Sequence, residues 1–257
     1  MIQILNILEF QVLAAAKGIQ AYYGFPGKKE TAREEISFAV YQLARAGILK
    51  QQGGELIIQE PTAGYMELLA SARGLIVLDR GQYRLPRQCI YSSRDRSGKE
   101  RYLCLENSST DADRLCLSAL EEEELELQME DLGQLPEPRL EEGLGDYDFE
   151  SYWNRQLPEG LWNLLAEGLK TETEQLLGME QVHSVFSHRE KHSGRLLGRL
   201  ILLDFPLEYC LVIQEGGANA ELMVYSRKQA LEYLKRWWRE EDYDTGGYLC
   251  SGSQSDL

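Results

Sequence analysis

Apolar residues in the first 50 positions recur at helical spacing. A first helix is predicted over roughly residues 4–18, where apolar side chains fall three or four positions apart. A second is predicted over residues 34–49, with Thr31 as its N-cap and Glu34 completing a capping box. The apolar stripe of this second helix consists of Ile36, Val40, Leu43 and Ala44.

The segment that follows, KQQGGELIIQE, has the pattern of a β-hairpin with Gly53 and Gly54 at its tip. Two helices followed by a glycine-tipped hairpin are the outline of a winged helix. A further short helix, GYMELLASARG, and a strand, LIVLD, come next along the chain. The N-terminal part is therefore expected to be mostly helical.

Two later stretches, residues 90–109 and 185–205, resemble each other. Each starts with a short apolar run, reaches an arginine–acid pair (Arg94-Asp95 and Arg189-Glu190), turns through Ser-Gly and returns as an apolar strand. A second strand pair is predicted after each, and in the first copy it includes LELQME, whose strict alternation is typical of a strand with one solvated face. The expected inward positions of the first copy are Leu103, Leu105, Leu115, Leu117, Leu125 and Leu127.

A helical segment precedes each copy, and the second copy is closed by a helix capped at Ser226. The expected fold is α+β, a pseudo-twofold repeat of helices plus an antiparallel meander sheet with a winged-helix-like N-terminal module. The expected segments are 1–60 (winged-helix-like module), 61–132 (first helix-plus-meander repeat), 133–150 (acidic Pro/Gly linker), 151–242 (second repeat) and 243–257 (disordered tail).

Charge is unevenly distributed over a chain whose net charge is −15. Residues 106–180 carry 21 acidic and 4 basic side chains, so the acidic excess lies in the middle of the chain. The simplest interpretation of residues 133–150 is a solvated linker, and the alternative is an acidic surface that meets a basic partner. The apolar fraction of 43% is that of a soluble protein. We expect a cytoplasmic location, because no apolar run is long enough to cross a membrane and MIQILNILEF lacks the features of a signal peptide.

The sequence contains no recognisable catalytic, metal or cofactor site. His183 and His188 are five apart on a predicted strand, which places them on opposite faces, and His192 falls in the following turn; all three are interpreted as surface residues. The five cysteines have no metal-type spacing and are interpreted as buried thiols. The glycine-rich segments match neither a P-loop nor a dinucleotide fingerprint. We therefore expect a protein that is not an enzyme and needs no cofactor.

A DNA-binding function must be weighed against charge. The candidate recognition helix offers Arg33, Gln42 and Arg45 but also carries Glu34 and Glu35. The hairpin tip has no basic residue, and the whole chain would be repelled by a polyanion. Nucleic acid is therefore not the expected partner, although a winged-helix transcriptional regulator remains the alternative function.

The order of elements resembles the EspG family, cytosolic chaperones of type VII (ESX) secretion. The resemblance is carried by the second repeat, SVFSHREKHSGRLLGRLILLDFPLEYCLVIQEGGANAELMVYSRKQALEYLKRWW. It contains a hairpin, a strand ending at Asp204 before the Phe205-Pro206 turn, another strand, and a closing helix that begins at Ser226. The turn after Asp204 departs from the family in lacking a small-residue and Gly-Arg step.

The resemblance implies a monomeric or weakly dimeric chaperone that performs no catalysis and caps the tip of a helical secretion substrate. Partner contacts would favour aromatic side chains, and the candidates are Tyr225, Trp237 and Trp238. Neighbouring tryptophans on a helix point about 100° apart, so one of the pair is expected at an edge or an interface. A scaffold that self-associates through its sheet edges is a further possibility, and an enzyme is the least favoured class.

Overall fold

The computed structural model describes residues 2–19, 22–23, 31–80, 87–95, 97–108, 113–131, 135–139, 161, 163, 173–205, 209–216 and 220–239. Within these residues the strands are β1 (Ile2–Asn6), β2 (Leu49–Gln52), β3 (Glu55–Ile58), β4 (Gly74–Arg80), β5 (Gln88–Arg94), β6 (Glu100–Asn107), β7 (Arg114–Leu120), β8 (Val182–Glu190), β9 (Leu196–Asp204), β10 (Tyr209–Glu215) and β11 (Glu221–Val224). The helices are α1 (Ile7–Ala16), α2 (Arg33–Arg45), α3 (Thr62–Ser71), α4 (Glu122–Asp131), α7 (Thr173–Leu177) and α8 (Arg227–Arg239). Among these residues no helix is both long and apolar enough to cross a membrane.

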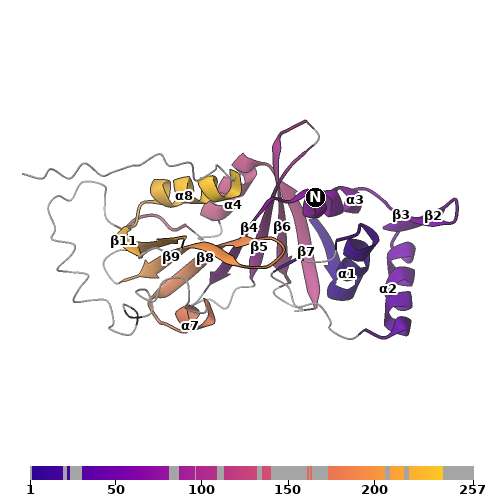
Figure 1. Cartoon of the computed structure of the whole chain (residues 1–257), viewed down its shortest axis with the longest axis horizontal. Coiled ribbons are helices and arrows are strands. Elements are labelled where there is room, and N and C mark those ends of the chain that lie inside the picture. Colours follow the sequence, from indigo (N-terminus) through magenta and orange to yellow (C-terminus); the bar gives the residue numbers. More distant parts are fainter. Residues whose placement is uncertain are drawn as a thin grey trace, which may run out of the picture.

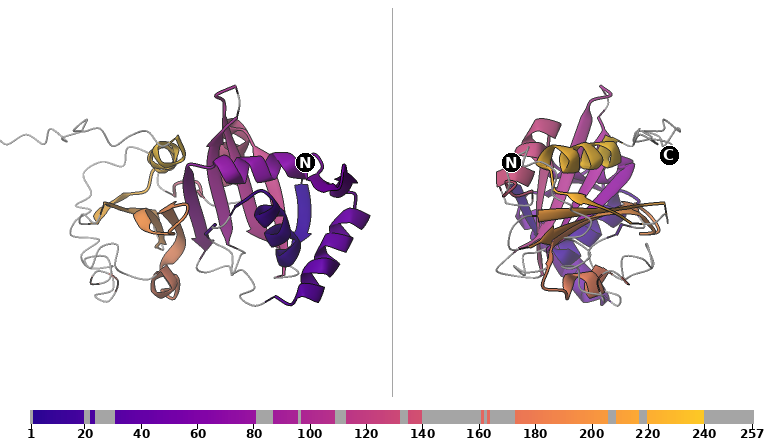
Figure 2. Two further views of the ribbon diagram at one scale, coloured as in Figure 1. Left: turned by 45° about the vertical axis from the view of Figure 1, so that its right-hand side comes forward. Right: turned by 90° about the vertical axis from the view of Figure 1, so that its left-hand side faces the viewer.

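One large sheet organises the molecule. Its nine strands lie in the order β1-β7-β6-β5-β4-β8-β9-β10-β11, and each neighbouring pair is antiparallel. Strand β4 lies in the middle, where it pairs with β5 on one side and β8 on the other. Strands β2 and β3 form a separate two-stranded hairpin, which projects with α2 at the end of the molecule opposite β11 (Figures 1 and 2).

The apolar core lies on both faces of this sheet. On one face α1 and α3 cover the first strands with residues such as Phe10, Met66 and Leu103. A second cluster on the same side joins Leu176 of α7 to β8, β9 and β10. On the opposite face α4 and α8 cover the sheet (Figure 1), and Trp237 packs there. The molecule therefore has the predicted α+β character, with a mixed set of helices on a large antiparallel sheet.

The N-terminal elements appear in the predicted order with shifted boundaries. Residues 2–6 form a strand rather than the start of the first helix, because they pair with β7. Helix α1 begins after Asn6, whose side chain accepts the Glu9 N–H while the Glu9 carboxylate accepts the Asn6 N–H. Helix α2 is capped one residue later than predicted, because Glu35, rather than Glu34, accepts the Ala32 N–H. The hairpin is confirmed, and its assignment to a winged helix stays a prediction.

Residues 122–131 contradict the sequence prediction, because LELQME lies in helix α4 and not in a strand. The Glu124 carboxylate accepts the Glu121 N–H at 2.8 Å, which caps the first turn. Leu125 and Met129, four residues apart, are both buried, whereas Leu127 is 58% exposed. Leu125, Leu127 and Met129 fit a strand period of two, whereas Leu125 and Met129 also fit a helical spacing of four. The segment forms a helix in which Leu125 and Met129 pack against the sheet.

The second meander and its closing helix are confirmed. Strands β8 to β11 follow one another along the sheet, and the Ser226 hydroxyl accepts the Gln229 N–H at 3.5 Å at the start of α8. The two similar stretches become the hairpins β5–β6 and β8–β9. They diverge afterwards, because α4 follows the third strand of the first stretch while β11 follows the third strand of the second. A pseudo-twofold repeat of the whole fold stays a prediction.

Part of the predicted acidic linker is packed against the body. In residues 135–139, Leu135 is buried, and its carbonyl oxygen accepts a 3.1 Å hydrogen bond from the guanidinium of Arg227. The same guanidinium pairs with Glu137 at 2.6 Å. Arg139 lies over the ring of Tyr209. Leu135 is therefore packed against the body, while Glu137 and Arg139 are exposed, and the linker assignment stays a prediction. The rest of the predicted linker lies outside the described residues. The same holds for the tail 243–257 and for the helical segment predicted at the start of the second repeat, of which residues 161 and 163 are described.

The five predicted segment boundaries remain predictions. Strand pairing adds one fact to them, which is that β1 belongs to the large sheet through its pairing with β7. Residues 1–60 and 61–132 are therefore joined by main-chain hydrogen bonds and by a shared core that contains Leu13 and Leu69.

Candidate protein-binding surface

The three side chains predicted to contact a partner are buried. Tyr225 is 4% exposed, and its hydroxyl donates a 2.9 Å hydrogen bond to the carbonyl oxygen of Pro136. Trp237 and Trp238 are each 1% exposed. All three side chains belong to the core under α8.

The expectation that one of the two tryptophans lies at an edge is wrong, because α8 rests broadly on the sheet and receives both indoles. Trp237 stacks on His188 with ring centroids 5.5 Å apart, and Gly198 leaves room for it, since a Cβ there would come within 3.2 Å of the indole. Trp238 turns the other way and meets the edge of Tyr102 at 5.8 Å. The two indoles point about 100° apart, and both are buried because one packs on β8 and the other on β6 of the same sheet.

Two of the three histidines are buried, contrary to the surface interpretation. His183 lies where the β8–β9 register shifts, and it contacts Tyr209, while His188 contacts Trp237. Both aromatic partners belong to the same core, so the irregular strand overturns the expectation of opposite faces. Burial lowers the pKa of His183 and lowers that of His188 to about 4, so these imidazoles are neutral at neutral pH. His192 is exposed in the β8–β9 turn, as predicted.

Nucleophilic and metal-binding groups are not gathered into a site in the described part of the chain. No group of three histidine, cysteine, aspartate or glutamate residues there could hold a metal ion. The thiols of Cys89, Cys104 and Cys210 are buried, as predicted, whereas Cys116 is half-buried. Burial raises the pKa of the Cys104 thiol to about 12, which suits a structural residue rather than a nucleophile.

Exposed apolar side chains are concentrated in the N-terminal elements instead. Seven of the eight large hydrophobic side chains that are exposed in the described residues lie between residues 2 and 57. They are Ile2 and Ile4 on β1, Ile36, Phe38 and Tyr41 on α2, and Leu56 and Ile57 on β3. Single exposed apolar residues are ordinary, but seven of them on three elements at one end of the molecule (Figures 1 and 2) make this end a candidate protein-binding surface. We call this set the N-terminal apolar surface.

Helix α2 is only lightly attached to the body. It buries Ala39 and Leu43, while Phe38 is 61% exposed and Tyr41 is 58% exposed. Phe38 and Tyr41 are three residues apart and therefore lie on one side of the helix. The sequence contained a usable signal for this surface, because both aromatic residues lie off the stripe that Leu43 represents.

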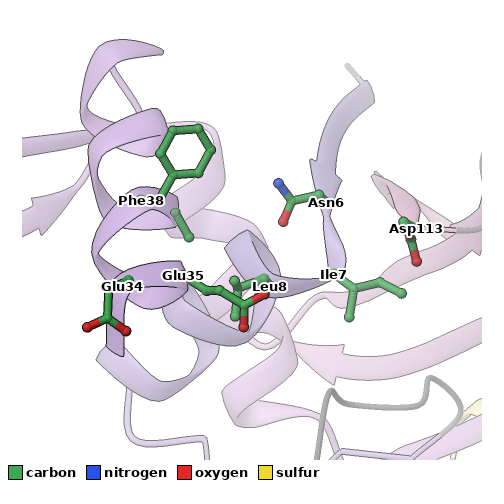
Figure 3. Close-up of a pocket in the computed structure, with 8 residues that line it drawn as sticks. Asn6, Ile7, Leu8, Glu34, Glu35, Phe38 and Asp113 are labelled. Atoms are coloured by element: carbon green, nitrogen blue, oxygen red, sulfur yellow. The ribbon is translucent and has the colours of Figure 1, made fainter. Parts of the chain in front are cut away.

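A groove with a volume of 510 Å³ separates α2 from the junction of β1 and α1. Its apolar lining includes Ile7, Leu8, Phe38 and Ala39 (Figure 3). Its remaining lining residues are Asn6 and three acids, which are Glu34, Glu35 and Asp113. The groove is therefore apolar inside and negatively charged at its rim, with no basic residue among those that line it.

Comparison with known proteins finds a likeness at the level of the fold. No family model and no curated protein matches the sequence. Among solved structures, the chain resembles the Mycobacterium tuberculosis type VII secretion system chaperone EspG5, solved in complex with a PE25-PPE41 dimer. The TM-score is 0.51 at 13% sequence identity, over 95% of this chain and 98% of that chain. The likeness extends over nearly the whole of both chains and is one of fold.

Proposed function

We propose that this protein is a non-catalytic, cytosolic chaperone or adaptor that binds a helical protein destined for secretion. The observation that supports the proposal best is the N-terminal apolar surface, on which Tyr41 and Leu56 are exposed on neighbouring elements. Aromatic side chains on a lightly attached helix are favourable contacts for the apolar stripe of a partner helix. The fold likeness to EspG5, a chaperone solved with a PE25-PPE41 dimer, supports the same class of function.

The electrostatics of α2 favour a protein partner over DNA. A helix that reads bases needs basic or amide side chains on its exposed face, with further cations for phosphates. The exposed side chains of α2 include Arg33 and Arg45 at its two ends, but Glu34 and Glu35 offset their charge. Phe38 and Tyr41 are exposed between them. A winged-helix regulator remains the second candidate, for which the order α1, α2, β2, β3 is the only support.

The proposal is tested by affinity capture from the native cytoplasm with the wild-type chain and two matched variants. The first variant, Tyr41→Ser with Leu56→Ser, removes two exposed apolar side chains from the N-terminal apolar surface. The control, Leu127→Ser, removes a side chain of equal exposure to Tyr41 from α4, outside that surface. We expect a co-purifying protein, helical by circular dichroism once isolated, whose affinity falls about thirty-fold in the double variant and is unchanged in the control.

Two results would contradict this proposal. Recovery of DNA that is lost at high salt would favour the winged-helix regulator. Equal capture of the partner by the wild-type chain and the double variant would remove the N-terminal apolar surface from the function.

A further inference from the structure

Strand β1 has one free edge. It is the first strand of the nine-stranded sheet, and among the described residues it pairs with β7 alone. The Ile7 N–H donates to the carbonyl oxygen of Asp113 at 2.9 Å, which continues the register Asn6↔Arg114 by one residue. In an antiparallel pair the main-chain groups point alternately toward and away from the partner. Since residue 7 points toward β7, residues 5 and 3 do so too, and residues 2, 4 and 6 point away.

The outward main-chain groups of Ile2 and Ile4 are available for pairing. The Asn6 N–H is taken by the Glu9 carboxylate at 2.9 Å. The carbonyl oxygen of Ile4 accepts one hydrogen bond, of 3.3 Å, from the side-chain amide of its neighbour Gln3, and this bond is exposed. No other partner for the outward groups of Ile2 and Ile4 occurs in the described part of the chain. A row of such groups is a template for an added strand.

This edge lacks the usual protection against pairing. Its sequence is IQILN, with no charged residue and no proline, and Ile2 and Ile4 are 69% and 53% exposed. Edge strands in monomeric proteins normally carry lysine, proline or a bulge that blocks association. An exposed, uncharged edge of this kind is open to pairing with an added strand.

The groove beside α2 continues from this edge and indicates the chemistry of the partner. Asn6 ends β1 and also lines the groove, so a strand added to β1 would extend past Phe38 (Figure 3). On the α2 side of the groove it would meet Glu34 and Glu35, whereas Asp113 lies across β1 on the β7 side. These carboxylates favour lysine or arginine side chains, and the apolar lining favours valine, isoleucine or leucine between them.

We infer that β1 binds an extended segment of a partner protein by strand addition, and that this segment alternates apolar with basic residues. The inference rests on the proposed function only in taking the partner to be a protein. A second copy of this chain fits less well, because its net charge of −15 would oppose the acidic rim. The extended segment is a contact separate from the helix expected on Tyr41 and Leu56.

The test uses fluorescence anisotropy with synthetic ten-residue peptides and the full chain. One peptide alternates valine with lysine, and the other alternates valine with glutamate. We expect the valine–lysine peptide to bind at least ten-fold more tightly than the valine–glutamate peptide, and its affinity to fall as salt is raised. Failure of the valine–lysine peptide to bind, or equal binding of both peptides, would overturn the inference.

The Ile4→Pro variant removes the outward N–H of β1 without removing a hydrogen bond to β7. Ile4→Thr is the matched control, because it keeps that N–H and a β-branched side chain. We expect Ile4→Pro to weaken peptide binding at least ten-fold and Ile4→Thr to change it less than three-fold, with both variants folded by circular dichroism. Should Ile4→Pro fail to fold, Glu34→Lys replaces it and is expected to weaken binding, with Glu123→Lys on α4 as its control.

The outcomes separate this inference from the proposed function. Loss of helical-partner capture by Tyr41→Ser with Leu56→Ser, while peptide binding persists, supports two distinct contacts. Peptide binding that depends on Ile4, in a chain that captures no helical partner, supports strand addition and defeats the chaperone proposal. A concentration-dependent mass that Ile4→Pro abolishes would overturn the inference, because a second copy would then occupy the edge.

Discussion

His188 is buried against the indole of Trp237, and this burial makes protonation of its imidazole costly. The side chain is 7% exposed, and desolvation lowers its pKa from 6.5 to about 4. In the unfolded chain the same group returns to its ordinary pKa, so between pH 6.5 and pH 4 the unfolded state binds more protons than the folded state. Stability is therefore lost as the pH falls through this window.

We expect His188→Phe to reduce this acid sensitivity. Phenylalanine keeps the stack on Trp237 and cannot be protonated. Between pH 7 and pH 4 the wild-type chain should lose about 3 kcal/mol more of its free energy of unfolding than the variant does. Denaturant titrations at a series of pH values measure the difference, in which the contributions of the carboxylates cancel. Parallel curves for the two proteins would mean that His188 is protonated as easily in the folded chain as in the unfolded one.

Residue-level prediction from the sequence failed mostly where burial was decisive. The helical period of α8 agrees with the burial of Ala230 and Leu234, which are four residues apart and both fully buried. It could not show that Trp238 is also buried, because that depends on Tyr102, which lies 136 positions away in the chain. The exposure of Phe38 and Tyr41, in contrast, could have been predicted, because both residues lie off the apolar stripe that contains Leu43.

At the scale of elements, α4 offers a direct comparison of helical and strand periodicity. Leu125 is fully buried, and Leu127 is 58% exposed. In a strand both would face the core, whereas in the observed helix only Leu125 does. We expect Leu125→Ala to lower the free energy of unfolding by about 2–5 kcal/mol and Leu127→Ala to change it by less than about 0.5 kcal/mol. If denaturant unfolding gave the same loss of free energy of unfolding for both variants, the strand prediction would be favoured over the helix.

The turns of the two similar hairpins share a local design. In each turn a carboxylate accepts a hydrogen bond from a serine hydroxyl. Ser97 donates to Asp95 at 2.5 Å, and Ser193 donates to Glu190 at 2.6 Å. Each turn then uses a glycine in the left-handed region, with φ of +84° at Gly98 and +69° at Gly194. This part of the sequence resemblance therefore corresponds to real structural similarity.

The two glycines differ in their surroundings, which allows a prediction. A Cβ at Gly98 would meet nothing within 4 Å, whereas a Cβ at Gly194 would come within 2.1 Å of the ring of Tyr23. We expect Gly98→Ala to cost about 1 kcal/mol for its backbone conformation alone. Gly194→Ala should cost clearly more, because Tyr23 has to move from its place beside Arg189. Thermal unfolding of the two variants gives the comparison, and equal shifts in Tm would show that Tyr23 is displaced without cost.

At the scale of the molecule, the sequence predicted the class of fold and the order of most elements because these depend on local periodicity. It could not predict the position of β1, since Ile2–Asn6 is assigned to the sheet by pairing with residues more than 100 positions away. This pairing matters for function, because it creates the free edge of β1 and the groove that Phe38 lines. Local patterns thus explain the body of the protein, while long-range pairing creates the candidate surface.

The continuous sheet also predicts how the molecule unfolds. Strand β4 pairs with β5 and β8, and its side chains enter both faces, with Val77 in the core under α1 and α3 and Ile76 in the core under α8. All four tryptophans lie after residue 150, so fluorescence reports on the C-terminal part, whereas far-UV circular dichroism reports on the whole chain. We expect the two signals to change in one coincident transition in denaturant, and Ile76→Ala to move both midpoints together. A dichroism transition that precedes the fluorescence transition would show that the N-terminal elements unfold separately, because β4 would then fail to couple the two cores.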